Sequence, residues 1–189
     1  MNIDNLLNLN TREMLREWLN ENHNIERYCW ILVSFKSKPD TLLYLDAVEE
    51  ALCFGWIDGI EKKISEDHLA QRLSPRSQKT SWTELNKERV RRMEKLGLMT
   101  DAGRKVLPDM DPEAFVIDPY IYQRLKEDPR VYDNFMGFPE LYRRIRIDTI
   151  QRVQKDKELY LSRLEKLIKK TRDNQMYGDW NDNGRLLDY

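Results

Sequence analysis

The sequence predicts an α+β fold, in which a small antiparallel sheet packs with helices and a mainly helical C-terminal region follows. Three observations carry this prediction: an apolar, aromatic-rich run at 28–35, a hairpin pattern at 56–73, and helical periodicity after residue 142. Antiparallel strands with helices between them are typical of this class. The chain has 189 residues, of which 40% are hydrophobic and 34% are charged, so it is long enough to bury a core.

The first predicted helix starts at Asn10 or Thr11, either of which can cap it, and ends within residues 20–24. Its apolar positions recur at helical spacing: Met14, Leu15, Trp18 and Leu19. The run that follows, from Tyr28 to Phe35, is apolar on both of its alternating faces. This pattern predicts a central strand that is covered on both sides.

A second helix is predicted to run through residues 45–52 to Gly55, which suits the left-handed position at a helix end. The hairpin has residues 56–64 as its first strand, 65–67 as its turn and 68–73 as its second strand. Together with the strand at 28–35, it completes the predicted antiparallel sheet.

Two further helices are predicted after the hairpin. Ser81 or Thr83 can cap a helix over residues 84–96 that Gly97 ends, and a short helix at 100–107 ends before Pro108.

Composition divides the chain into an α+β domain at 1–107, a proline-rich acidic connector at 108–140, a basic helical region at 141–172 and a polar tail at 173–189. Five of the seven prolines lie in the connector, where we expect only short helical turns. Residues 141–172 contain eleven Lys or Arg and four Asp or Glu, a local balance of +7.

Several function classes lack support. The net charge is −1, so no overall field attracts nucleic acid or membrane, and no apolar run of about 18 residues predicts a membrane span. Neither a phosphate loop nor a catalytic or metal-binding motif is present, so we expect no cofactor and no metal. The two cysteines lie in apolar runs and the N-terminus has no signal pattern, which predicts free thiols and a cytoplasmic location.

Three segments around the hairpin carry polar side chains that could meet on one face: 55–59, 71–76 and 81–86. The candidate ligand-binding residues are Trp56, Asp58, Arg72, Arg76, Trp82 and Asn86. Arginine suits carboxylate or phosphate, and the helix start near Thr83 also favours an anion. The alternative interpretation is structural: Asp58 and Arg72 form a cross-strand ion pair, Trp56 and Trp82 are core or rim aromatics, and Ser81 is a helix cap.

Several short motifs occur in order along the first half of the chain: the GWIDG sequence at 55–59, Pro75-Arg76, Ser81-Trp82 with Asn86, and the 97–100 segment with Gly103. With these motifs, the stretch from Trp30 to Thr100 resembles the YdeI/OmpD-associated family of bacterial proteins. Ser77 departs from the family pattern, and the helical tail matches it only loosely, around residues 142–147. The resemblance implies a link to bacteriocin protection, envelope stress or antimicrobial resistance, and does not imply a reaction.

Three functional hypotheses follow. The first is a binding protein that accepts an anionic small molecule or a protein partner at the candidate site. The second is an enzyme in which Asp58 acts as a base while Arg72 and Asn86 orient a substrate. The third, not favoured, is nucleic-acid binding by the basic helices at 141–172. The sequence does not determine the oligomeric state.

Overall fold

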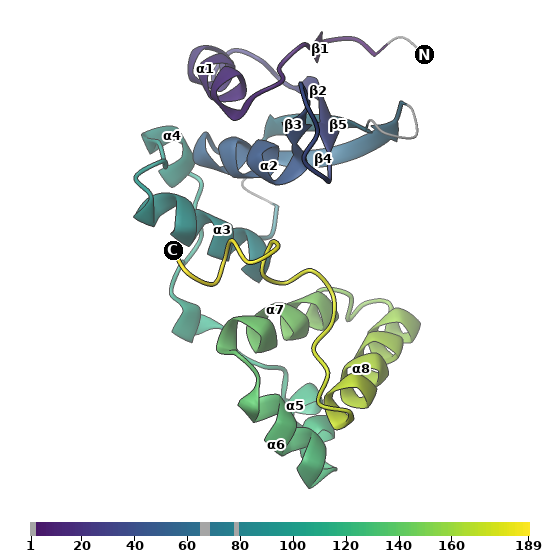
Figure 1. Cartoon of the computed structure of the whole chain (residues 1–189). Helices are drawn as coiled ribbons and strands as arrows, with labels where there is room; N and C mark the ends of the chain where they lie inside the picture. Colours follow the sequence, from purple (N-terminus) through teal and green to yellow (C-terminus); the bar gives the residue numbers. More distant parts are fainter. Residues whose placement is uncertain (1–2, 65–68, 78–79) are drawn as a thin grey trace. The chain divides into compact units, whose positions relative to one another are not determined.

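The computed structural model describes residues 3–64, 69–77 and 80–189 (Figure 1). The predicted hairpin turn at 65–67 and the predicted start of the second hairpin strand at His68 lie outside these residues. The chain forms two compact units. The first consists of Met1–Ser81 and Arg89–Pro108, and the second of Trp82–Glu88 and Asp109–Tyr189.

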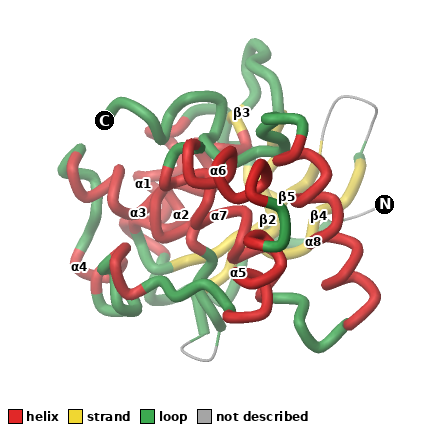
Figure 2. The backbone as a smooth tube through the Cα atoms, turned by 90° about the horizontal axis from the view of Figure 1, so that it is seen from below, coloured by secondary structure: helices red, strands yellow, loops and turns green. Residues whose placement is uncertain are grey.

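The α+β prediction is confirmed. The described strands all precede Arg76, and the regular structure that follows Pro108 is helical. Figure 2 shows the strands in yellow and the helices in red. None of the described helices combines the length and the apolar character that crossing a bilayer requires.

The described residues of the first unit form a five-stranded mixed sheet whose central strand is β2 (Cys29–Ser34). On one side, β2 pairs antiparallel with β5 (Leu69–Pro75), and β5 pairs antiparallel with β4 (Trp56–Lys63). On its other side, β2 pairs in parallel with two very short strands, β1 (Leu6–Leu7) and β3 (Leu42–Leu43). The covered central strand and the hairpin pairing are therefore as predicted, and the two short parallel strands are additional.

The helices that begin before Pro108 are α1 (Arg12–Asn22), α2 (Tyr44–Cys53), α3 (Glu84–Lys95) and α4 (Asp101–Arg104). Helix α2 packs against β2 and β4, and α1 packs against α2 (Figure 1). Of the two predicted caps of α1, Thr11 is the one that accepts a bond from the third helical residue. Helix α4 is shorter than predicted, because Thr100 caps it and it ends at Arg104.

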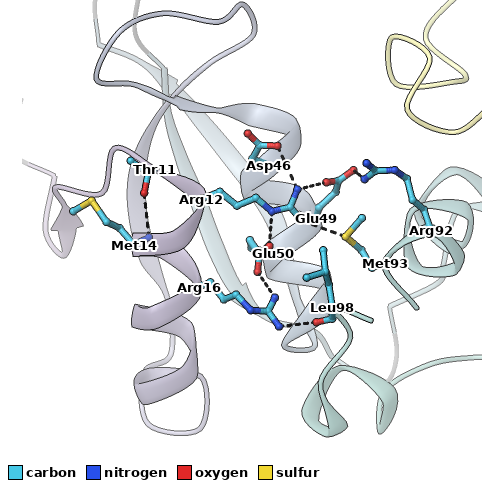
Figure 3. Close-up of polar contacts among 10 residues, drawn as sticks. All are labelled: Thr11, Arg12, Met14, Arg16, Asp46, Glu49, Glu50, Arg92, Met93 and Leu98. Atoms are coloured by element: carbon cyan, nitrogen blue, oxygen red, sulfur yellow. Dashed lines mark hydrogen bonds and ion pairs between the residues drawn. The ribbon is translucent and has the colours of Figure 1, made fainter. Parts of the chain in front are cut away.

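A cluster of charged side chains joins α1, α2 and the C-terminal half of α3 inside the first unit (Figure 3). Arg12 bonds Glu50 at 2.6 Å and Glu49 at 2.7 Å. Arg16 bonds the second oxygen of Glu50 at 2.7 Å, and Arg92 bonds the second oxygen of Glu49 at 2.7 Å. Both glutamates are buried, so the arginines supply the charge and the hydrogen bonds that burial requires.

The second unit contains a short 3-10 helix, η1 (Pro112–Ala114), and four α-helices: α5 (Pro119–Lys126), α6 (Pro129–Gly137), α7 (Glu140–Gln151) and α8 (Lys157–Arg172). Three of these elements begin with an Asp cap followed by proline in the first turn. Proline is favoured there because its missing N–H would have no helical partner. Three of the five prolines between residues 108 and 139 therefore start short helices.

These helices share one apolar core. Ile121, Leu125, Val131 and Phe135 from α5 and α6 are fully buried in it with side chains of α7 and α8. After α8 the chain returns to this core, where Trp180 stacks edge-on against Tyr142 at a ring distance of 5.5 Å.

Candidate functional site

The first unit contains a cavity of about 500 Å³ at the point where β4 begins and β5 ends. The end of α1 and the start of α4 complete its wall. Its lining includes Trp56 and Arg76 from the predicted site, together with His23, Phe54 and Lys105. Side chains that are far apart in the sequence thus surround one space.

Trp56 is fixed at the edge of this cavity. Only 1% of the residue is exposed, its indole N–H donates to the carbonyl oxygen of His23 at 3.1 Å, and its ring stands edge-on to Trp18 at 5.8 Å. An indole with its polar group satisfied forms a rigid apolar wall.

Arg76 provides a cationic side chain in the same lining. It is 6% exposed, its backbone N–H donates to the carbonyl oxygen of Gly55 at 2.9 Å, and Nη2 lies 3.5 Å from the carbonyl oxygen of Ser81. The guanidinium group remains charged at any physiological pH. A buried cation at a cavity favours an anion as ligand.

His23 also lines the cavity, and its tautomer follows from its surroundings. Its Nδ1 lies 2.9 Å from the carbonyl oxygen of Leu19, which can only accept a hydrogen bond. We therefore assign the proton of the neutral ring to Nδ1, which makes Nε2 an acceptor. The imidazole was not among the predicted site residues, because nothing in its local sequence distinguishes it from an ordinary residue after a helix.

Asp58 lies on β4 but is not part of the cavity lining. The hydroxyl of Tyr44 donates to Asp58 Oδ2 at 2.7 Å. Burial, and then the charge of Asp58, raise the pKa of Tyr44. Tyr44 therefore remains a neutral donor, and the contact ties the start of α2 to the sheet.

Arg72 points to the opposite face of the sheet from Asp58. In the register of the hairpin, Asp58 pairs with Leu73, so that the neighbouring residue Arg72 faces the other way. The Arg72 guanidinium lies 4.5 Å from the centre of the Tyr28 ring, a cation–π contact. The sheet register thus separates two residues that the sequence analysis expected to converge, and it does not support their direct ion pair.

Trp82 and Asn86 belong to the second unit. The Trp82 carbonyl accepts a bond from Arg152 at 3.2 Å, and the backbone N–H of Asn86 donates to Thr83 Oγ1 at 3.0 Å. Thr83 is therefore the residue that caps α3. Of the six predicted residues, the structure places Trp56 and Arg76 together at the first-unit cavity.

Many cations of the basic region at 141–172 have partners within the second unit. Arg144 bonds Glu84 at 3.0 Å, Glu88 at 2.6 Å and Glu140 at 2.7 Å. Other arginines that contribute to the +7 charge balance also have partners within the unit. Arg146 donates to the Asp179 carbonyl, Arg163 donates to the Thr149 carbonyl, and Arg172 pairs with Asp128. This arrangement weakens the case for a nucleic-acid surface.

Across residues 3–64, 69–77 and 80–189, no cluster of three or more His, Cys, Asp or Glu side chains is arranged to hold a metal ion.

The fold and the cavity together describe an α+β protein whose first unit contains a cavity lined by polar and apolar side chains. Comparison with protein families gives two matches. The chain belongs to the family of a domain of unknown function, DUF8412, whose model matches residues 7–106, more than half of the sequence. Residues 114–174 match the family described as Bacteriocin-protection, YdeI or OmpD-Associated. Searches of curated proteins and of solved structures gave no match.

The predicted family is confirmed, but the position of the match differs from the prediction. The motifs that carried the resemblance lie before residue 104, whereas the YdeI/OmpD-associated match covers the helical region that the sequence analysis treated as a loose fit. The apolar positions of amphipathic helices lie three or four residues apart, with surface residues between them. Such a pattern contains no short continuous motif by which the sequence alone would reveal the family.

Proposed function

We propose that the first unit binds a small anionic molecule in the cavity lined by Trp56 and Arg76. The observation that carries the proposal is Arg76, a residue that is 6% exposed and lines a cavity of about 500 Å³. Cavities that hold small molecules measure roughly 300–1,000 Å³ and combine apolar walls with few polar groups.

Each lining group has a distinct role in this proposal. Arg76 bonds the carboxylate or phosphate of the ligand, and Lys105 at the rim adds a second positive charge. The Phe54 and Trp56 rings contact the apolar body of the ligand, and the unprotonated Nε2 of His23 accepts a hydrogen bond from it.

The test measures thermal stabilisation of the whole chain by carboxylates, sugar phosphates and nucleotides. We expect one of these classes to raise Tm in the parent and in Arg72→Gln, a matched control on another face of the sheet. The same compound should give no shift with Arg76→Gln and a smaller shift with Lys105→Glu. Because Lys105 is exposed, the second variant tests the site without disturbing buried groups. An equal shift in all four proteins would refute the proposal, as would the absence of any shift in the parent.

The physiological part of the proposal is a role in bacteriocin protection, supported by the family match at residues 114–174. Bacteria that express the chain should survive bacteriocin treatment better than cells without it, and Arg76→Gln should abolish the difference if ligand binding is required. Equal survival with and without the chain would contradict this role.

A cytoplasmic location is also proposed. It is supported by Cys29 and Cys53, which are free and buried, since unpaired structural thiols are common in reducing compartments. Fractionation of cells that express the chain would test it.

A further inference from the structure

A second cavity, of about 310 Å³, lies within the second unit between the segment 112–117 and the first turns of α7. Pro112, Phe115 and Ile117 provide its apolar lining. Glu113 and Arg143 contribute a carboxylate and a guanidinium group to the same space. Glu140 and Arg144 complete the lining, so the cavity combines an apolar wall with two charges of each sign.

Arg144, which also lines this cavity, is already paired with carboxylates. Its Nη1 and Nη2 atoms donate to Glu140 and Glu88, and its Nε forms an ion pair with Glu84 at 3.0 Å without hydrogen-bond geometry. Because three carboxylates surround the Arg144 guanidinium group, they balance its charge, and it does not favour an anionic ligand.

Arg143 has weaker partners. Its Nη1 lies 3.3 Å from the thioether sulfur of Met136, which is a weak acceptor. Its Nε is buried and has no hydrogen-bond partner among the described residues. A buried N–H of a charged group without an acceptor is unfavourable, and an anion in the cavity would supply the acceptor.

The apolar wall is held in place by Gln151 at the end of α7. Its side-chain amide donates to the carbonyl oxygen of Val116 at 3.2 Å and accepts from the backbone N–H of Asp118 at 2.7 Å. Phe115 and Ile117 pack against the core of the second unit. The wall is thus preorganised, which reduces the entropy cost of binding.

We propose that this cavity binds a small apolar amino acid in its zwitterionic form. The carboxylate bonds Arg143, the ammonium group lies near Glu113, and the side chain contacts Phe115 and Ile117. A volume of about 310 Å³ is at the lower end for ligand sites, which favours a ligand of this size over a larger metabolite.

The experiment is calorimetric titration of the full chain with L-leucine, glycine, L-leucinamide and N-acetyl-L-leucine at millimolar concentrations. We expect L-leucine to bind at least about tenfold more tightly than any of the other three, since each of them lacks one recognised group. Absence of leucine binding would overturn the proposal, and so would equal binding of leucinamide. Equal binding of N-acetyl-L-leucine would also overturn it, because a free amine would then not be recognised.

Variants locate the site. Arg143→Gln should weaken leucine binding at least about tenfold, and Glu113→Gln should weaken it less because that carboxylate is exposed. Arg130→Gln, which changes an exposed arginine of α6 outside the cavity lining, is the matched control and should bind as the parent does. The inference is independent of the first-unit cavity, so Arg76→Gln should also bind leucine normally. Unchanged binding by Arg143→Gln would show that leucine occupies a different place.

Discussion

Replacing Arg12 by methionine should destabilise the first unit by about 3 kcal/mol. Arg12 bonds two carboxylates, Glu49 and Glu50, whose side chains are 0% and 1% exposed. Burial on its own would lower the pKa of Arg12, but the two glutamates outweigh it and raise the pKa, so the residue is a permanent cation in the cluster. Methionine keeps an unbranched chain while removing the charge and the hydrogen bonds.

The magnitude follows from what remains after the substitution. Removing one partner of a buried ion pair costs about 3–5 kcal/mol, because a charge is left buried without compensation. Here Glu49 still bonds Arg92 and Glu50 still bonds Arg16, each at 2.7 Å. These second contacts place the expected loss at the lower end of that range.

The assay is urea unfolding at neutral pH, with hydrogen exchange of the α1 and α2 amides to assign the loss to the first unit. Arg104→Met is the matched control. Arg104 also bonds a glutamate, Glu94, but the two side chains are 45% and 44% exposed, so its loss should cost much less than the loss of Arg12.

The reasoning would be refuted if Arg12→Met and Arg104→Met lost the same free energy of unfolding. A further variant separates burial of charge from loss of packing. Adding Glu49→Gln and Glu50→Gln to Arg12→Met should recover part of the stability, because neutral amides cost less to bury than uncompensated carboxylates. A further loss of unfolding free energy on adding these two changes would show that the carboxylates also stabilise the unit through their other partners, Arg16 and Arg92.

Three other outcomes are expected. Gly55→Ala should cost about 1–3 kcal/mol of unfolding free energy in urea titrations, since φ is +75° and the new Cβ would lie 3.0 Å from a backbone oxygen. Gly97→Ala, with φ of +70° and open space, should cost less in the same titrations. Burial raises the pKa of the Asp148 carboxyl above its ordinary 3.8, so the folded state binds this proton more tightly than the unfolded state does. The contribution of Asp148 to the unfolding free energy therefore falls as the pH rises from 3.8 through the raised pKa. The unfolding free energy of Asp148→Asn relative to the parent should therefore increase over that window, and a flat difference in urea titrations would contradict the assignment. Burial raises the pKa of Cys29 and of Cys53 to about 12, so neither thiol should react with iodoacetamide at neutral pH until the chain is unfolded, as mass spectrometry would show.

The elements that the sequence predicted correctly are those with strong local patterns. Strand β2 follows from an apolar run and α3 from helical spacing with a cap and a terminal glycine. Strands β1 and β3 could not be predicted in this way, because two residues contain no period. They exist through pairing with β2, which is a property of the folded chain.

Which of the predicted site residues share a face of the sheet depends on the register of the hairpin strands, and the sequence pattern did not determine that register. A shift of one residue moves a side chain to the other face of a sheet. The hairpin has an irregularity between Asp58 and Glu61, and its register places Asp58 and Arg72 on opposite faces. Trp56 and Arg76 come together because the start of β4 and the end of β5 are neighbours, which any tight pairing of the predicted hairpin would bring about.

Each of the two family matches falls mainly in one structural unit. The match at 114–174 lies wholly within the second unit, and most of the match at 7–106 lies within the first. The two proposed ligand sites divide in the same way, with no lining residue in common. Anion binding near Arg76 would thus be a property of the DUF8412 region, and amino-acid binding near Arg143 a property of the YdeI/OmpD-associated region. Because Arg76→Gln and Arg143→Gln each change one lining, bacteriocin survival measured with both variants would show which ligand, if either, the protective role requires.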